Sequence, residues 1–392
     1  MVLMKKTYYF DYAAATPVSS QVLTAMEPFW QTQFYNPSAL YLSAREVRKH
    51  IDSARASVAK TIGVKPYEII FTAGATESIN LAIAGISKMY PMSGIIISSM
   101  EHEAVSEAAK LYFNKNLKIC PVHKNGIIQP EKLKDLIDDN TVLISFMYVN
   151  NEIGTVQPLK QVSKMIEQVK QNRQKSKNPL PLYLHSDASQ APNYLSVKEQ
   201  RLGVDLLSLN GGKIYGPKQS GCLFVQKYIE IKPLIAGGGQ ERGLRGGTEN
   251  VANIIGFAKA LELAQANYKI EARRVAKLRN YLLEELQKSV SGLTVNGSLK
   301  QRIANNLNIS IAGVSGETLV HYLDTTEIMV ATGAACSAAK DKPSATLKSL
   351  GLSAKQIEGS IRISLGTYTN QEQIKHLLKE LPKTLAKVKQ LA

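Results

Sequence analysis

The sequence predicts an α/β fold in which a mostly parallel sheet is covered by helices. Short apolar segments alternate with amphipathic or loop segments between about residues 43 and 230, and this alternation is typical of a parallel sheet wrapped by helices. At 392 residues the chain is long enough for two or three domains. Its 44% hydrophobic and 20% charged residues are typical of a folded protein with a large core.

The segments that predict strands are short and apolar. In chain order they are 68–72, 94–98, 142–149, 182–185, 204–209 and 221–225. A stretch rich in Ala, Leu, Glu and Lys predicts a helix from about Gly256 to Lys288. Beyond it, expected strands at 306–311 and 361–365 mix with helical segments. This mixture indicates a second, smaller α+β domain.

Composition also excludes several classes of protein. No apolar run approaches the roughly 20 residues that span a bilayer, and residues 5–11 lack the apolar core of a secretory signal. We therefore expect a cytoplasmic protein without membrane contact. The three cysteines, Cys120, Cys222 and Cys336, are too few and too scattered for a disulfide framework or a thiol metal cluster. We expect no metal, and any special cysteine acts singly.

The net charge of +16 allows two interpretations. It could attract RNA or acidic protein partners, because positive charge raises the rate of encounter with anions. It could also reflect general lysine usage, since the lysines are spread along the chain and cluster only mildly at 170–177. The second interpretation is favoured, and we expect no direct binding of nucleic acid.

Two residues at the ends of neighbouring apolar runs indicate a pyridoxal phosphate site. Asp187 follows the run 180–184, and Lys213 follows the run 204–209. Pyridoxal phosphate needs an amine that holds its aldehyde as a Schiff base and an acid that keeps its ring nitrogen protonated. Ligands of open α/β sheets collect outside the carboxyl ends of the strands, where both side chains would emerge. Either residue alone is more simply a loop lysine or a helix-capping aspartate.

Two small-residue loops could hold the phosphate or serve a ligand. The segment 72–78 follows an expected strand and precedes a helical run, so its backbone amides and the Thr76 hydroxyl could meet a dianion. A simple capping turn would look the same. The segment 237–250 carries six glycines together with Arg242, Arg245 and Thr248. A flexible surface loop is the alternative, but the arginines favour a ligand or a subunit contact.

A third loop of tiny residues, 331–339, surrounds Cys336. Free cysteine is usually a buried hydrophobic residue, and Cys120 and Cys222, which lie in or beside apolar strands, fit that description. The small neighbours of Cys336 would leave its thiol exposed and able to move, as a thiolate nucleophile requires.

With these residues in view, the chain resembles the class V aminotransferase-like pyridoxal phosphate enzymes over nearly its whole length, and within them the NifS/IscS-type cysteine desulfurases. The matching segments are 11–17, 71–78, 101–102, 149–154, 187–190, 213–217, 237–248, 333–338 and 361–366. The resemblance implies PLP-dependent fold type I, with a mostly parallel seven-stranded sheet in a large domain at 16–260. A small domain would comprise 1–15 and 261–392 and carry the cysteine loop.

The resemblance also implies roles at the cofactor. Lys213 would bind the aldehyde and move the α-proton, Asp187 would pair with the ring nitrogen, and His102 would stack on the ring. Gln190 would reach the phenolic oxygen. The remaining implied cofactor contacts are Ala75, Thr76, Asn151, Asn210, Gly212 and, from the second subunit of a homodimer, Thr248.

For the substrate, the resemblance implies that Asn151 and Arg362 orient the carboxylate of L-cysteine, since arginine suits a bidentate grip. Cys336 would then attack the substrate sulfur, leave with it as a persulfide and release L-alanine. The persulfide would pass to an acceptor or scaffold protein for iron–sulfur cluster assembly or tRNA thiolation. The alternatives are a desulfurase-like binding subunit with impaired turnover, and a selenocysteine lyase or another class V enzyme.

The segment before Lys213 departs from the family pattern. Asn210 stands where the family has serine, and Gly212 stands where it has histidine. Both positions contact the cofactor phosphate in the family. We expect Asn210 to donate a hydrogen bond and Gly212 to contribute its backbone N–H, in place of the missing groups.

Overall fold

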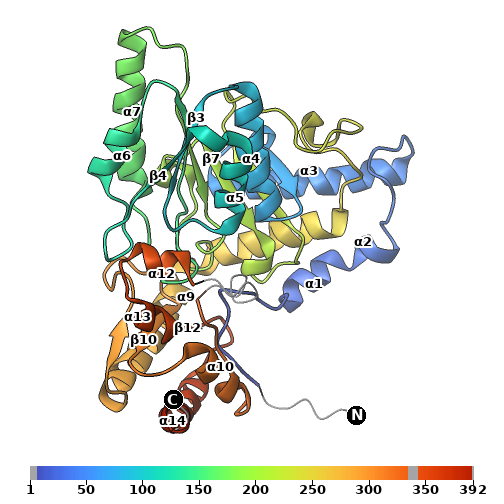
Figure 1. Cartoon of the computed structure of the whole chain (residues 1–392). Helices are drawn as coiled ribbons and strands as arrows, with labels where there is room; N and C mark the ends of the chain where they lie inside the picture. Colours follow the sequence, from blue (N-terminus) through green and yellow to red (C-terminus); the bar gives the residue numbers. More distant parts are fainter. Residues whose placement is uncertain (1–6, 334–342, 391–392) are drawn as a thin grey trace.

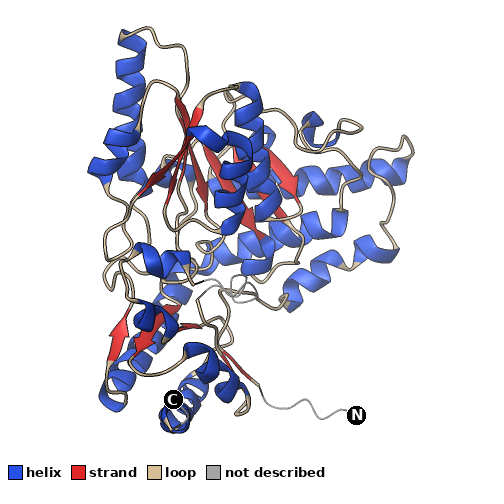
Figure 2. Ribbon diagram, viewed as in Figure 1, coloured by secondary structure: helices blue, strands red, loops and turns tan. Residues whose placement is uncertain are grey.

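The computed structural model describes residues 7–333 and 343–390, and its main layer is the predicted α/β sheet (Figure 1 and Figure 2). Neighbouring strands are parallel except β8, which is antiparallel to both β2 and β7. In spatial order the strands are β2 (Ile69–Thr72), β8 (Gly221–Val225), β7 (Leu206–Asn210), β6 (Tyr183–Asp187), β5 (Thr141–Ser145), β3 (Gly94–Ser98) and β4 (Leu117–Cys120).

Six of these strands coincide with the predicted segments, and the differences have physical causes. The predicted strand 142–149 was too long, because β5 ends at Ser145 and the chain then leaves the sheet toward the site. The edge strand β4 was not predicted. It pairs only with β3, and its residues are mostly half-exposed or exposed, so it lacks the continuous apolar run of a central strand.

Alternate residues of the strands face two separate cores, as the two-residue repeat of a strand requires. Ile69 and Ile96 belong to one core, whereas their neighbours Ile70 and Ile97 belong to the other. The first core is covered by α3 (Leu42–Ile62), α7 (Leu159–Lys175) and α9 (Val251–Ser289). The second is covered by α4 (Ala75–Met89) and α5 (Glu103–Phe113). Burial of both faces explains why the central strands are apolar throughout.

A smaller layer lies below the main sheet in Figure 1. Its antiparallel sheet has the order β12 (Ser360–Ser364), β10 (Asn306–Ile311) and β9 (Leu293–Val295). Near it, β1 (Tyr8–Tyr9) pairs in parallel with β11 (Ile328–Met329). The helices of this part are α10 (Gly316–Asp324), α12 (Ala345–Ser349), α13 (Ala354–Glu358) and α14 (Gln371–Lys389). The expected α+β layer is therefore present.

Helix α9 connects the two layers. Its 39 residues correspond to about 58 Å, and the helix packs on α1 and α3 at one end and on α14 and β10 at the other. The predicted division of the chain at residue 260 falls inside this helix and stays a prediction. The remaining helices are α1 (Ser20–Met26), α2 (Pro28–Gln31), α6 (Pro130–Leu136) and α8 (Glu199–Leu202).

Within 7–333 and 343–390, no helix is both long and apolar enough to cross a membrane. Nor do the side chains of this part of the chain form a group of three or more His, Cys, Asp or Glu residues that could hold a metal ion.

Candidate functional site

A cavity of about 570 Å³ opens at the amino terminus of α4. Gly74 precedes the helix with φ 119°, a conformation that L side chains rarely adopt, and this turns the chain from β2 into α4. The first backbone amides of the helix, at Ala75 and Thr76, line the cavity. Such amides, together with the helix dipole, favour an anion. Five of the predicted site residues line this cavity: Ala75, Thr76, Asn210, Gly212 and Lys213.

Lys213 ends a short 3-10 turn, Gly211–Lys213, that follows β7. Its Nζ donates a hydrogen bond to the carbonyl of Ala14, which also lines the cavity. The turn is fastened to the N-terminal segment a second time, because Thr16 donates its backbone N–H to the carbonyl of Gly212 at 3.2 Å. The amine therefore points into the cavity, against a segment more than 190 residues away in sequence.

Asp187 is the last residue of β6, beside β7 in the parallel part of the sheet. Its Oδ1 accepts hydrogen bonds from the backbone N–H and the hydroxyl of Ser189, at 2.9 and 2.6 Å. Its Oδ2 has no hydrogen-bond partner among the described residues. Asp187 and Lys213 thus emerge from the carboxyl ends of adjacent parallel strands, as their positions after two apolar runs predicted.

A fully buried histidine lies behind Asp187. His185 is hydrogen-bonded between the hydroxyls of Ser145 and Ser208, at 2.7 Å from Nδ1 and 2.9 Å from Nε2. Burial lowers the pKa of His185 to about 4, against the opposing effect of the nearby Asp187 charge. The imidazole is therefore neutral at physiological pH and links β5, β6 and β7 beneath the site.

A hydrogen bond between Asn210 and Gly212 corrects one expectation. The Gly212 N–H donates to Oδ1 of Asn210 at 3.0 Å, so it is engaged within the turn and is not left for a phosphate. Asn210 keeps its Nδ2 amide as a donor at the cavity wall. The donor that this segment offers to a phosphate is therefore the side-chain amide of Asn210 rather than the backbone N–H of Gly212.

Arg362 lies on β12 with 1% of its surface exposed. Nη2 donates to Oδ1 of Asp11 at 2.7 Å, and Nη1 donates to the backbone carbonyl of Asn151 at 3.1 Å. Its Nε is buried and has no hydrogen-bond partner among the described residues. A buried guanidinium N–H without an acceptor is costly, and a carboxylate ligand would supply that acceptor. Asp11 was not predicted as a site residue, although its motif was noted.

Six of the predicted site residues do not line the α4 cavity: His102, Asn151, Asp187, Gln190, Thr248 and Arg362. The imidazole of His102 caps α5, because Nδ1 accepts the N–H of Ala104 at 3.1 Å. Gln190 donates from Nε2 to the carbonyl of Ala13 at 3.0 Å. Thr248 is exposed. The contact of His102 holds the turn between β3 and α5, and the contact of Gln190 holds the N-terminal segment.

Glu101 beside His102 was not predicted as a site residue. Its carboxylate accepts the N–H of Met147 at 3.0 Å from each oxygen and the hydroxyl of Ser98 at 2.5 Å. Burial raises the pKa of Glu101 to about 8, and the charge of Asp187 adds to the shift. The contacts tie the turn that carries His102 to the segment that follows β5.

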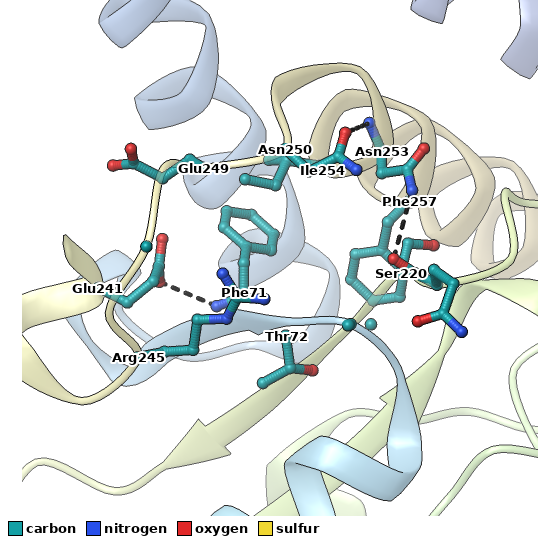
Figure 3. A pocket seen from close by; sticks show the side chains of 14 residues that line it. Phe71, Thr72, Ser220, Glu241, Arg245, Glu249, Asn250, Asn253, Ile254 and Phe257 are labelled. Carbon is teal, nitrogen blue, oxygen red and sulfur yellow. Dashed lines mark hydrogen bonds between the residues drawn. The ribbon is translucent and has the colours of Figure 1, made fainter. Parts of the chain in front are cut away.

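The glycine-rich loop is held by partly buried ion pairs, as a purely flexible loop would not be. Glu241 accepts two hydrogen bonds from Arg55, at 2.6 and 2.7 Å, and Arg245 donates to Glu77 of α4 at 3.0 Å. A second cavity, of about 190 Å³, is lined by Glu241, Arg245, Phe71 and Phe257 among others. Figure 3 shows these side chains. The two cavities share Ala73 and Gln219.

Cys336 lies outside the described residues. Cys120 and Cys222 are fully buried on β4 and β8, which confirms their reading as core residues. Burial raises the pKa of Cys120 to about 11 and also raises the pKa of Cys222. Neither thiol is poised to act as a thiolate.

This geometry agrees with the comparisons to known proteins. The family description "Aminotransferase class-V" matches residues 8–377. A "Cysteine desulfurase IscS" of Dictyoglomus turgidum is 40% identical, covering 99% of this chain and 97% of that protein. One of Methanosarcina thermophila is 38% identical, covering 99% and 94%. The chain therefore belongs to the class V aminotransferase family, within its group of cysteine desulfurases.

Solved structures lead to the same group. A "NifS-like protein" superposes with a TM-score of 0.88 at 34% identity, covering 97% of this chain and all of that chain. A second structure, "SspA in complex with cysteine", superposes with a TM-score of 0.79 at 32% identity, covering 93% and 100%. The predicted fold and family are confirmed.

Proposed function

We propose that this protein is a cysteine desulfurase that converts L-cysteine to L-alanine and carries the sulfur away as a persulfide on Cys336. The observation that supports it most directly is the pairing of Lys213 and Asp187 at the ends of adjacent strands, beside the anion-binding start of α4. The full-length similarity to proteins named cysteine desulfurase supports the reaction.

The residues present fit pyridoxal 5'-phosphate as the cofactor. Lys213 would supply the amine for its aldehyde. Asp187 has Oδ2 without a protein hydrogen-bond partner among the described residues, as an acceptor for the ring N–H requires. Ala75 and Thr76 would hold the phosphate at the amino terminus of α4. His102 would stack on the ring, and the remaining implied contacts are Gln190, Asn151, Asn210 and, from a second subunit, Thr248.

The bound cofactor would supply an electron-withdrawing ring that makes the α-proton of cysteine acidic. Lys213 would accept and return that proton at its Nζ. Arg362 would hold the substrate carboxylate through its Nε–H, which has no acceptor among the described residues. Cys336 would form a sulfur–sulfur bond with the substrate as the carbon–sulfur bond breaks, and the electron pair would return to carbon, which is protonated to give alanine.

We also propose that the active form is a homodimer. Large apolar side chains are exposed between α1 and the start of α3, with Phe34 65%, Leu40 85% and Leu42 77% exposed. A concentrated apolar surface of this kind is typical of a protein–protein contact. The exposed Thr248 would then be available to the partner's site. The sulfur would pass to an acceptor or scaffold protein of the cytoplasm, for iron–sulfur cluster assembly or tRNA thiolation.

The test is incubation of the purified chain with L-cysteine and a reductant, with alanine and sulfide measured together. Equal amounts of the two products are expected. Cofactor retention without products would instead favour a binding subunit with impaired turnover, and preference for selenocysteine would favour a lyase. Borohydride reduction followed by mass spectrometry checks the cofactor: the adduct should lie on Lys213, and an adduct on another lysine would contradict the assignment.

A further inference from the structure

Among the described residues, the charged side chains that line the α4 cavity include one cation that remains available to a phosphate. The cavity's ionisable lining side chains among the described residues are Glu77, Lys213 and Lys218. Glu77 accepts the Nε–H of Arg245 and the backbone N–H of Ala73, both at 3.0 Å, so its charge is balanced. Lys213 is the amine that the cofactor aldehyde needs. Lys218 is therefore the positive side chain left at this cavity for a dianion.

The backbone of Lys218 is fixed in place. Its carbonyl and that of Gln219 both accept hydrogen bonds from Nδ2 of Asn253 on α9, at 3.3 Å each. Gln219 has φ 58°, in the left-handed region that residues other than glycine rarely occupy. The hydrogen bonds from Asn253 hold the turn in this conformation and so keep Lys218 at the cavity wall.

Lys218 lies over the glycine of the Lys213 turn. A Cβ on Gly212 would be 3.6 Å from Cγ of Lys218 and 3.7 Å from its Cα. The aliphatic stem of Lys218 therefore passes close beside Gly212, which has no side chain to compete for that space. Lys218 forms an ion pair with no carboxylate of 7–333 or 343–390, so its charge is uncompensated within this part of the chain.

We propose that Lys218 is a phosphate-binding residue of the cofactor site, acting with the amino terminus of α4. The inference rests on the proposed function. It names a residue that neither the family motifs noted above nor the comparisons assign. A lysine at this place would stabilise the phosphate dianion as a mobile point charge, which suits a cavity rim open to solvent.

The experiment measures binding rather than turnover. Full-length protein stripped of cofactor is titrated by equilibrium dialysis with pyridoxal 5'-phosphate and, separately, with pyridoxal, which has no phosphate. The variants are Lys218→Met and Lys218→Arg. The matched control is Lys227→Met, which removes an equal charge from an exposed lysine outside the cavity lining.

We expect Lys218→Met to weaken binding of pyridoxal 5'-phosphate on the order of tenfold, the size of one charge-assisted contact. The affinity of Lys218→Met for pyridoxal should not change. Lys218→Arg should keep most of the wild-type affinity for pyridoxal 5'-phosphate, and Lys227→Met should have the wild-type affinity. Added salt should reduce the difference. Unchanged binding in Lys218→Met would overturn the inference, as would an equal loss for both ligands. Failure of the wild type to bind pyridoxal 5'-phosphate would instead overturn the proposed function.

Discussion

The substitution Gly212→His tests whether this protein lacks a phosphate contact because it has glycine where the family has histidine. The φ of Gly212 lies outside the left-handed region, and an added Cβ would be 3.5 Å from Oδ1 of Asn210 and 3.6 Å from Cγ of Lys218. These are ordinary van der Waals distances. The backbone therefore accepts a side chain, and histidine can adopt the angles of this turn.

The magnitude follows from what already holds a phosphate here. One charge-assisted hydrogen bond contributes about 1.5 to 3 kcal/mol, or roughly ten- to a hundredfold in affinity. The amino terminus of α4, the Thr76 hydroxyl and Lys218 would already neutralise much of the dianion. We therefore expect a gain near the lower limit, about tenfold tighter binding of pyridoxal 5'-phosphate.

The assay is the dissociation constant of pyridoxal 5'-phosphate for Gly212→His, with Gly212→Ala as the matched control. Alanine adds the Cβ and its effect on the unfolded chain without adding an imidazole. If Lys218 and the new imidazole serve the same phosphate, the gain should be larger in a Lys218→Met background, because contacting groups are not additive. Equal or weaker binding of the histidine variant relative to the alanine variant would refute the lost-contact reasoning.

Three further predictions use other parts of the site. Cys336→Ala should retain the cofactor spectrum and L-cysteine binding but lose persulfide formation; unchanged sulfide release would place the nucleophile elsewhere. Arg362→Lys should raise KM for L-cysteine roughly ten- to a hundredfold, because lysine lacks the planar fork; an unchanged KM in steady-state assays would contradict the carboxylate role. Glu101→Gln should flatten the pH dependence of stability. Since the folded-state pKa of Glu101 is raised to about 8, the folded protein keeps a proton that the unfolded chain releases between its lower pKa and about pH 8. Stability therefore falls as pH rises through this window, with a slope of up to about 1.4 kcal/mol per pH unit. Denaturation midpoints of both proteins between pH 5 and 9 check this, and parallel curves would count against it.

Local patterns predicted most of the fold because they reflect burial. Central strands such as β3 and β8 are covered on both faces and read as apolar runs, so their limits were predicted to the residue. Four strands were not predicted: β1, β4, β9 and β11. β1 and β11 have two residues each, too few for an apolar pattern. β4 and β9 are at sheet edges and mostly half-exposed, so solvent rather than the core sets much of their composition. The end of β5 was misplaced because apolar residues continue past Ser145 into buried loop segments.

The sequence by itself determined the site's chemical groups: Asp187 and Lys213 after neighbouring apolar runs, small residues at 72–76, and the segments that identify the family. These depend on residues close together in the chain. The tertiary structure alone decided how distant groups combine. Arg362 contacts Asp11 across 351 positions, Lys213 contacts Ala14, and Lys218 lines the same cavity as the start of α4. Such pairings follow from strand order and loop packing, which bring together residues whose separation in sequence carries no signal.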